Sequence, residues 1–288
     1  MLLWSTEFWD TQEIPYTIDV VGSREIFTTV IGNNLFSGFL GPFGGPTPRK
    51  NNNLPQDHSD LSQVIDLAIA KTKMQGLESL FFRLPPRNFY SLDSSDLESI
   101  LLEKNFHLLH IDTNHSQNLL EDNILLFNRN RKRDYKYWSE KGARFISPSS
   151  SPLMAFDCLV ENRKLRNLNT SITFSKYLNL ARALGQRVQL HHLESQDGIL
   201  AAAITMELDQ DIIYVFMWGD NPSIRRQEPS PLSYFYASLS EHFKQRGFST
   251  ICLGVSSSKG LIDEPLFKFK TSLGLDTSPK PTYSISVV

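Results

Sequence analysis

The sequence predicts an α/β protein with two domains, each with a mixed, mostly antiparallel sheet flanked by helices. The chain has 288 residues, enough for two domains at roughly 150 residues each. Runs rich in β-branched and aromatic residues, separated by turn residues, alternate with segments of helical periodicity. The composition is 40% hydrophobic and 21% charged, with a formal net charge of -2. Such values are typical of a globular protein and exclude a disordered chain.

The first half begins with three short strands. Gly22 and Gly32 lie in the turns between them. In chain order, the predicted elements are strands over 14–21, 25–31 and 34–40, a Gly- and Pro-rich loop over 41–48, a helix from residue 57 or 59, a strand over 79–84, a helix over 95–104 and a strand over 107–112. They are sufficient for one domain, which we place at residues 1–119.

The second half, residues 120–288, has a three-strand meander at its centre. The three β-rich runs are separated by short turns, one of which contains Asp197-Gly198. A later helix is expected to begin at Ser230, which would cap it, with Pro231 at the first helical position. The predicted elements are helices over 121–141, 153–167 and 173–184, strands over 189–195, 198–208 and 212–218, the helix from Ser230, a strand over 249–255, a helix over 264–273 and a final strand.

Composition excludes several classes of protein. Only Cys158 and Cys252 occur, so neither a disulfide framework nor a cysteine-based zinc site is expected. His191 and His192 are neighbours on a predicted strand and point to opposite faces, so no metal site is predicted. No apolar run approaches the ~20 residues that cross a bilayer, and no basic region of a signal peptide opens the chain. We expect a cytoplasmic protein with no membrane span and no DNA partner.

Three short sequence motifs in the second half resemble those of a known family. The meander ends in YVFMWGD (214–220), the next helix ends in RGF (246–248) before a strand, and the last helix reads FKTSLG (269–274). Together with the order of elements over about 14–285, they resemble the FemABX-related branch of the acetyltransferase (GNAT) fold. The resemblance implies two such domains in one chain, with the site in the second.

The resemblance implies an N-acyltransferase. The donor would be an acyl-CoA or an aminoacyl-tRNA used as co-substrate, with no tightly bound cofactor. The acceptor would be an amino group of a small-molecule or nucleotide-linked amine, such as an amino sugar or a cell-envelope precursor. Two departures matter: residues 221–230 lack the family's glycine-rich donor loop, and Leu273 replaces an aromatic residue. The alternative is a binding or scaffolding protein that keeps the fold without catalysis.

The donor would bind near the start of the helix at Ser230. Free N–H groups at a helix N-terminus bind phosphate, and Ser230 and Ser233 lie there. Arg225 and Arg226, just upstream, would add charge-assisted bonds. Trp218 would form an aromatic wall at the strand end. Each feature also has a structural interpretation. Ser230 could simply cap the helix, the two arginines could belong to a solvated loop, and Trp218 could be a core residue.

The resemblance assigns Lys270 to stabilise negative charge on the donor or the developing oxyanion. Tyr234, in the first turns of the helix from Ser230, is the expected proton donor. The attacking amine needs a base, for which Asp220 and Glu207 on the meander are the candidates. In the alternative interpretation Lys270 is a solvated lysine, Asp220 is a turn residue and Glu207 is an exposed strand residue. Asp112 and His115, at the end of the first half, are further titratable groups.

Two regions are candidates for binding the acceptor. Arg129 and Arg133 lie on one basic face of the predicted helix 121–141 with Lys132 and Lys136, and could bind phosphates or simply be solvated. Phe43, in the middle of the 41–48 loop, could line a groove, although such glycines and prolines often only shape a turn.

Overall fold

The computed structural model describes residues 10, 15–37, 47–48, 58–89, 94–170, 172–208, 211–225 and 228–287. The chain divides into two compact units. Unit 1 contains His115–Gly254 and Glu264–Thr277, and unit 2 contains the described residues up to Asn114, Val255–Asp263 and those from Ser278 on. The boundary expected at residue 119 stays a prediction.

Unit 2 has a sheet with the strand order β1-β2-β3-β5-β14-β6. The pairs β1–β2, β2–β3 and β5–β14 are antiparallel, and β3 and β5 run parallel. Its elements are β1 (Tyr16–Val21), β2 (Arg24–Ile31), β3 (Asn34–Ser37), β4 (Thr47–Pro48), α2 (His58–Met74), β5 (Ser79–Arg83), a 3-10 helix (Arg87–Phe89), α3 (Ser94–Glu103), β12 (Ser257–Ser258) and β13 (Leu261–Ile262). Val64 and Ile65 of α2 pack with Leu80 and Phe82 of β5 in its core, because the apolar residues of α2 recur at helical spacing.

Unit 1 has the strand order β6-β11-β10-β9-β8-β7. Its elements are α4 (Asn123–Leu126), α5 (Arg129–Glu140), β7 (Arg144–Ile146), α6 (Pro152–Leu165), α7 (Phe174–Leu184), a 3-10 helix (Gly185–Arg187), β8 (Val188–Ser195), β9 (Gly198–Glu207), β10 (Ile212–Asp220), α8 (Pro222–Arg225), α9 (Leu232–Gln245), β11 (Thr250–Val255) and α10 (Glu264–Ser272). The strands β6 (His107–Asn118) and β14 (Asp276–Ser286) contribute residues to both units.

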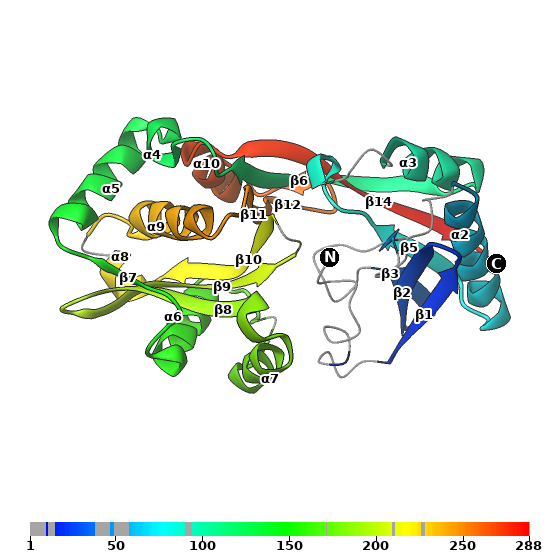
Figure 1. The fold of residues 1–288 in the computed structure, drawn as a ribbon, viewed down its shortest axis with the longest axis horizontal. Helices are drawn as coiled ribbons and strands as arrows, with labels where there is room; N and C mark the ends of the chain where they lie inside the picture. Colours follow the sequence, from blue (N-terminus) through cyan, green and yellow to red (C-terminus); the bar gives the residue numbers. More distant parts are fainter. Residues whose placement is uncertain are drawn as a thin grey trace. The chain divides into compact units, whose positions relative to one another are not determined.

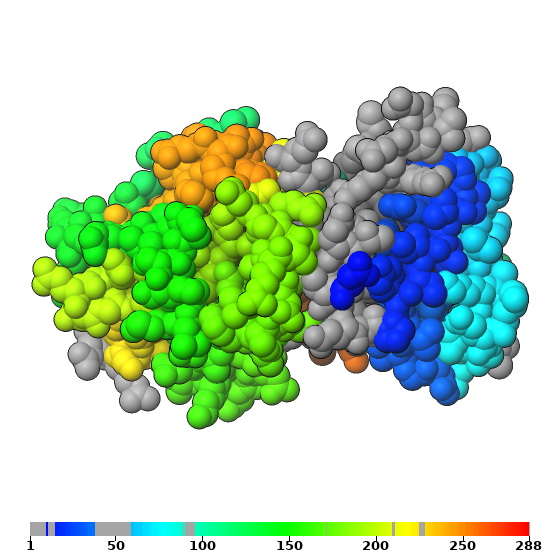
Figure 2. Space-filling view, turned by 60° about the horizontal axis from the view of Figure 1, so that its bottom comes forward, coloured from blue at the N-terminus to red at the C-terminus, as the bar shows by residue number. Residues whose placement is uncertain are grey.

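Helices cover both faces of the sheet of unit 1. α6 and α7 pack on one face, and α9, with α4 and α5 outside it, packs on the other (Figure 1). The space-filling view shows the face that α6 and α7 cover (Figure 2). Phe235, Tyr236 and Leu239 of α9 are fully buried with Ile213 and Val215 of β10, and they form the core of this unit.

The structure confirms the predicted fold class and the meander β8-β9-β10, which is antiparallel throughout. Two predicted helix boundaries are wrong. The single helix over 121–141 is broken, because Phe127 is extended and Asn128 caps a new helix by accepting from Arg131 N at 3.0 Å. α9 begins at Leu232, after Pro231 as the N-cap residue.

Candidate functional site

The strands β10 and β11 part in the middle of unit 1. Their parallel register runs from Ile212–Thr250 to Tyr214–Cys252 and ends there, although β10 continues along β9 to Asp220. A bulge between Val215 and Met217 lies just beyond the last β10–β11 pair. Because a bulge bends its strand and changes which residues face each side, it accompanies the separation of the two strands.

Lys270 of α10 lies at the point where these strands part. Its side chain is only 2% exposed, and Nζ donates to the carbonyls of Leu253 at 2.8 Å and Gly254 at 2.9 Å. Successive strand carbonyls normally point to opposite sides. Gly254 has φ +69°, a conformation that glycine adopts without strain, and the turn it makes lets both carbonyls accept from one ammonium group.

Two buried polar residues of β6 lie beside α9 and α10. The ring of His115 meets that of Phe267 edge-on at 5.4 Å, and burial, with a smaller contribution from the charge of Lys270, lowers the pKa of His115 to about 4. Gln117 Oε1 accepts from the hydroxyl of Tyr236, whose pKa is raised by burial. Gln117 Nε2 is buried with no hydrogen-bond partner among the described residues. The sequence alone predicted no role for Gln117 or for Tyr236.

Trp218, whose expected role in donor binding stays a prediction, lies among aromatic rings on the part of β10 that follows the bulge. Its ring lies 6.4 Å from that of Tyr236 and 5.7 Å from that of Phe269, between centroids. The guanidinium of Arg131 lies 5.4 Å from the centroid of the Phe269 ring. The site therefore combines a buried cation, an aromatic wall and polar groups from β6.

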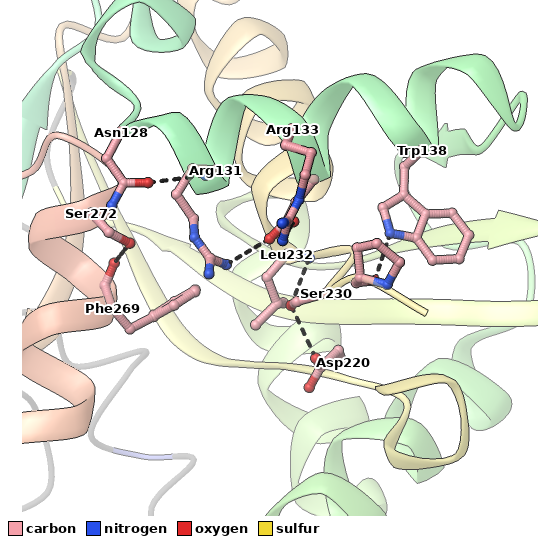
Figure 3. A network of polar contacts seen from close by, with 11 residues as sticks. Asn128, Arg131, Arg133, Trp138, Asp220, Ser230, Leu232, Phe269 and Ser272 are labelled. Atoms are coloured by element: carbon pink, nitrogen blue, oxygen red, sulfur yellow. Dashed lines mark hydrogen bonds and ion pairs between the residues drawn. The ribbon is translucent and has the colours of Figure 1, made fainter. Parts of the chain in front are cut away.

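Asp220 is fully buried at the end of β10 and joins two elements (Figure 3). Oδ1 accepts from Asn162 Nδ2 of α6 at 2.8 Å, and Oδ2 accepts from Ser230 Oγ at 3.2 Å. The indole of Trp138 donates to the carbonyl of Pro229 at 2.9 Å. These hydrogen bonds hold the segment before α9 in place, so Asp220 and Ser230 have a structural role. Their expected chemical roles stay predictions.

Several predicted residues lie elsewhere. Glu207 is opposite Ile213, at the other end of β10 from Trp218, and pairs with Arg246 at 2.5 Å. Ser233 is fully buried, and its Oγ has no hydrogen-bond partner among the described residues. Tyr234 faces the outer side of α9, where its ring lies 5.3 Å from that of Tyr135.

The predicted acceptor residues of α5 lie on its outer face. Arg129 and Arg133 are exposed, and Arg133 Nη2 lies 3.2 Å from the buried carboxylate of Asp134. Phe43 and Arg226 lie outside the described residues, as does the side chain of Arg225.

Asp112, named among the titratable groups, belongs to unit 2. It accepts from Ser257 Oγ at 2.8 Å and from Gly260 N at 3.1 Å, and so holds the β12–β13 hairpin.

The part of the chain that the structure describes contains no group of three or more His, Cys, Asp or Glu side chains placed to hold a metal ion. None of its helices has the length and apolar character needed to cross a membrane. His191 and His192 instead bond to serines: Nδ1 of His191 lies 2.8 Å from Ser147 Oγ, and Nδ1 of His192 lies 2.7 Å from Ser149 Oγ.

Solved structures share this fold at low sequence identity. FemX has a TM-score of 0.72 and 11% identity, over 99% of this chain and 92% of that one. L-PGS from Bacillus licheniformis has a TM-score of 0.65 and 12% identity, over 96% and 85%. A tandem GNAT protein from the clavulanic acid biosynthesis pathway has a TM-score of 0.52 and 7% identity, over 93% and 79%. No protein-family model matches the chain, and no curated protein matches its sequence. The chain therefore has the fold that FemX, L-PGS and the tandem GNAT protein share, as its sequence motifs predicted.

Proposed function

We propose that this protein is an N-acyltransferase that moves an acyl or aminoacyl group from a thioester or ester donor to an amino group. The donor is an acyl-CoA or an aminoacyl-tRNA, and the acceptor is an amino sugar or another envelope precursor. The fold shared with FemX and L-PGS supports a transferase of this general kind. Since fold alone does not fix function, the proposal depends on the site.

The observation that carries the proposal is the position of Lys270 where β10 and β11 part. When an amine attacks the donor carbonyl, negative charge develops on the carbonyl oxygen, and a cation held in a site of low dielectric stabilises it. Leu253 and Gly254 hold the ammonium of Lys270 in place, so no reorganisation is needed during the reaction. Because the pKa of His115 is about 4, its imidazole is neutral at pH 7 and does not repel the ammonium of Lys270.

Donor binding tests the proposal. Acetyl-CoA, longer acyl-CoAs and charged tRNA are each added to the protein, and the melting temperature is measured. A donor at ~100 times its dissociation constant adds ~2.7 kcal/mol of stability. Acyl transfer to an amine is then assayed for Lys270→Met, which keeps the length of the side chain, and for Lys268→Met as the matched control. We expect at least a tenfold loss of transfer in the first variant alone.

A non-catalytic binding protein is the second candidate. Residues 221–230, which replace the glycine-rich donor loop, favour this candidate. The end of this segment is hydrogen-bonded to Trp138 and Asp220. No melting shift with any donor, together with equal behaviour of the two lysine variants, would support it over the transferase.

A further inference from the structure

A cavity of about 470 Å³ opens on the outer side of α9, apart from Lys270 and Trp218. One wall is a single stripe of α9 that includes Tyr234, Ser238 and Glu241, since residues spaced by three, four and seven share a helix face. Residues before and within α4, together with Tyr135 of α5, form the other wall. Its size lies in the range of ligand sites in proteins.

Charge around this cavity is predominantly negative. Glu121, Asp122 and Glu241 contribute three carboxylates, against the single ammonium of Lys244, for a formal net charge of -2. Asp122 Oδ1 accepts from Ile124 N at 3.0 Å, and Glu241 Oε1 accepts from Gln245 Nε2 at 2.8 Å. Each of these carboxylates has a second oxygen that can accept further hydrogen bonds.

An aromatic pair lines the same cavity. The rings of Tyr135 and Tyr234 lie 5.3 Å apart at an interplanar angle of 37°, and burial, with the nearby Tyr234 and Asp122, raises the pKa of Tyr135. Neutral phenol rings attract cations to their faces. Phe127 separates this pair from the candidate active site, because its ring lies 6.4 Å from Tyr135 and 6.2 Å from Tyr236.

The aromatic pair and Glu241 mark two separate cation subsites. Tyr234 and Glu241 are seven residues apart on α9, a rise of about 10 Å along the helix. Ser238, between them, has a short side chain that leaves the space open. A ligand with a cationic group at each end and an apolar chain between them matches the charge of this cavity and the separation of its two subsites along α9.

We propose that this cavity binds a linear aliphatic diamine, with one ammonium against the tyrosine pair and the other at the carboxylate of Glu241. The proposal does not depend on acyl transfer at Lys270.

Calorimetric titration with cadaverine tests the proposal. We expect one saturable site for cadaverine, at least tenfold weaker binding of pentylamine, which has one cation, and no saturable binding of pentanediol, which has none. Binding of pentanediol as tight as that of cadaverine, or no saturation with cadaverine, would overturn the proposal.

Two variants and one control variant test whether cadaverine binds in this cavity. Ser238→Leu fills the cavity without changing its charge, and should weaken cadaverine at least tenfold. Glu241→Gln, which changes only the charge of one wall, should weaken cadaverine at least fivefold and pentylamine less. Glu140→Gln removes a carboxylate of α5 that lies outside the cavity and is 67% exposed, and should leave affinity within twofold. Circular dichroism and melting check each fold. Equal losses in Glu241→Gln and Glu140→Gln would mean diffuse surface attraction and would refute the site.

Discussion

Lys270 and Lys268 lie two residues apart on α10 and have opposite environments. Lys268 is 76% exposed and pairs with Glu264 at 3.3 Å, whereas Lys270 is buried and bonds two backbone carbonyls. Truncating Lys270 leaves a cavity and unsatisfied buried carbonyls. We expect Lys270→Ala to lower the free energy of unfolding by ~2–4 kcal/mol, and Lys268→Ala to change it by less than ~0.5 kcal/mol. Urea denaturation of both variants measures this, and equal midpoints would contradict it.

Two buried histidines predict a pH dependence of stability. Burial is the main cause that lowers the pKa of His115 to about 4 and that of His191 to about 3, against ~6.5 in an unfolded chain. Below pH ~6.5 the unfolded chain therefore binds protons that the native protein does not. The free energy of unfolding should fall as pH drops from ~6.5 to ~4, by up to ~1.4 kcal/mol per pH unit for each histidine, and should be level above pH ~7.5.

Denaturation curves at several pH values check this dependence. His191→Gln serves as the variant, because glutamine can still bond to Ser147 and Thr205, which now lie 2.8 and 2.7 Å from the imidazole. The variant should show a shallower slope between pH 4 and 6. An unchanged slope would assign the acid sensitivity to other groups.

At the scale of elements, the bulge of β10 decides which side chains face α9. Val215 lies opposite Thr205 and Met217 opposite Ile204, so Phe216 is the extra residue. Deleting Phe216 preserves these pairs and removes the bend. We expect the shortened strand to remain folded, and donor affinity to fall at least tenfold because β10 no longer parts from β11.

Phe216→Ala is the matched control, since it keeps the residue count and the bulge. It should retain donor affinity within about threefold, well under the ~1.4 kcal/mol that a tenfold change represents. Melting curves and donor titrations of both variants decide the question. If the deletion variant binds donor normally, the parting of the strands is not needed for the site.

At the scale of the whole molecule, cutting the chain at residue 119 would leave each unit without one of its strands. Residues 115–118 of β6 belong to unit 1, and Thr282–Ser286 of β14 pair with β5 of unit 2. We expect the fragments 1–119 and 120–288 each to lack a cooperative melt, because each loses a strand and exposes a sheet edge. Circular dichroism of the separately expressed fragments tests this, and a sharp transition in either one would contradict it.

The sequence by itself determined the local elements and the fold class. The strands of the meander, α9, β11 and α10 follow from alternating or helical patterns within a few residues, because such patterns depend on neighbours along the chain. The short motifs around Trp218, Arg246 and Lys270 predicted the fold that the solved structures share. Two of these motifs contain Trp218 of β10 and Lys270 of α10.

Only the tertiary structure decided the burial of polar residues and their partners. β6 was expected to end near residue 112, but Asn114, His115, Ser116 and Gln117 continue it and are buried. A polar run resembles a loop in sequence, and its burial depends on hydrogen-bonding groups far along the chain, such as Tyr236. The same holds for Lys270, whose two carbonyl partners lie sixteen and seventeen residues away, and for Asp220 of β10, which accepts from Asn162 of α6. Local patterns contain no information on such distant partners.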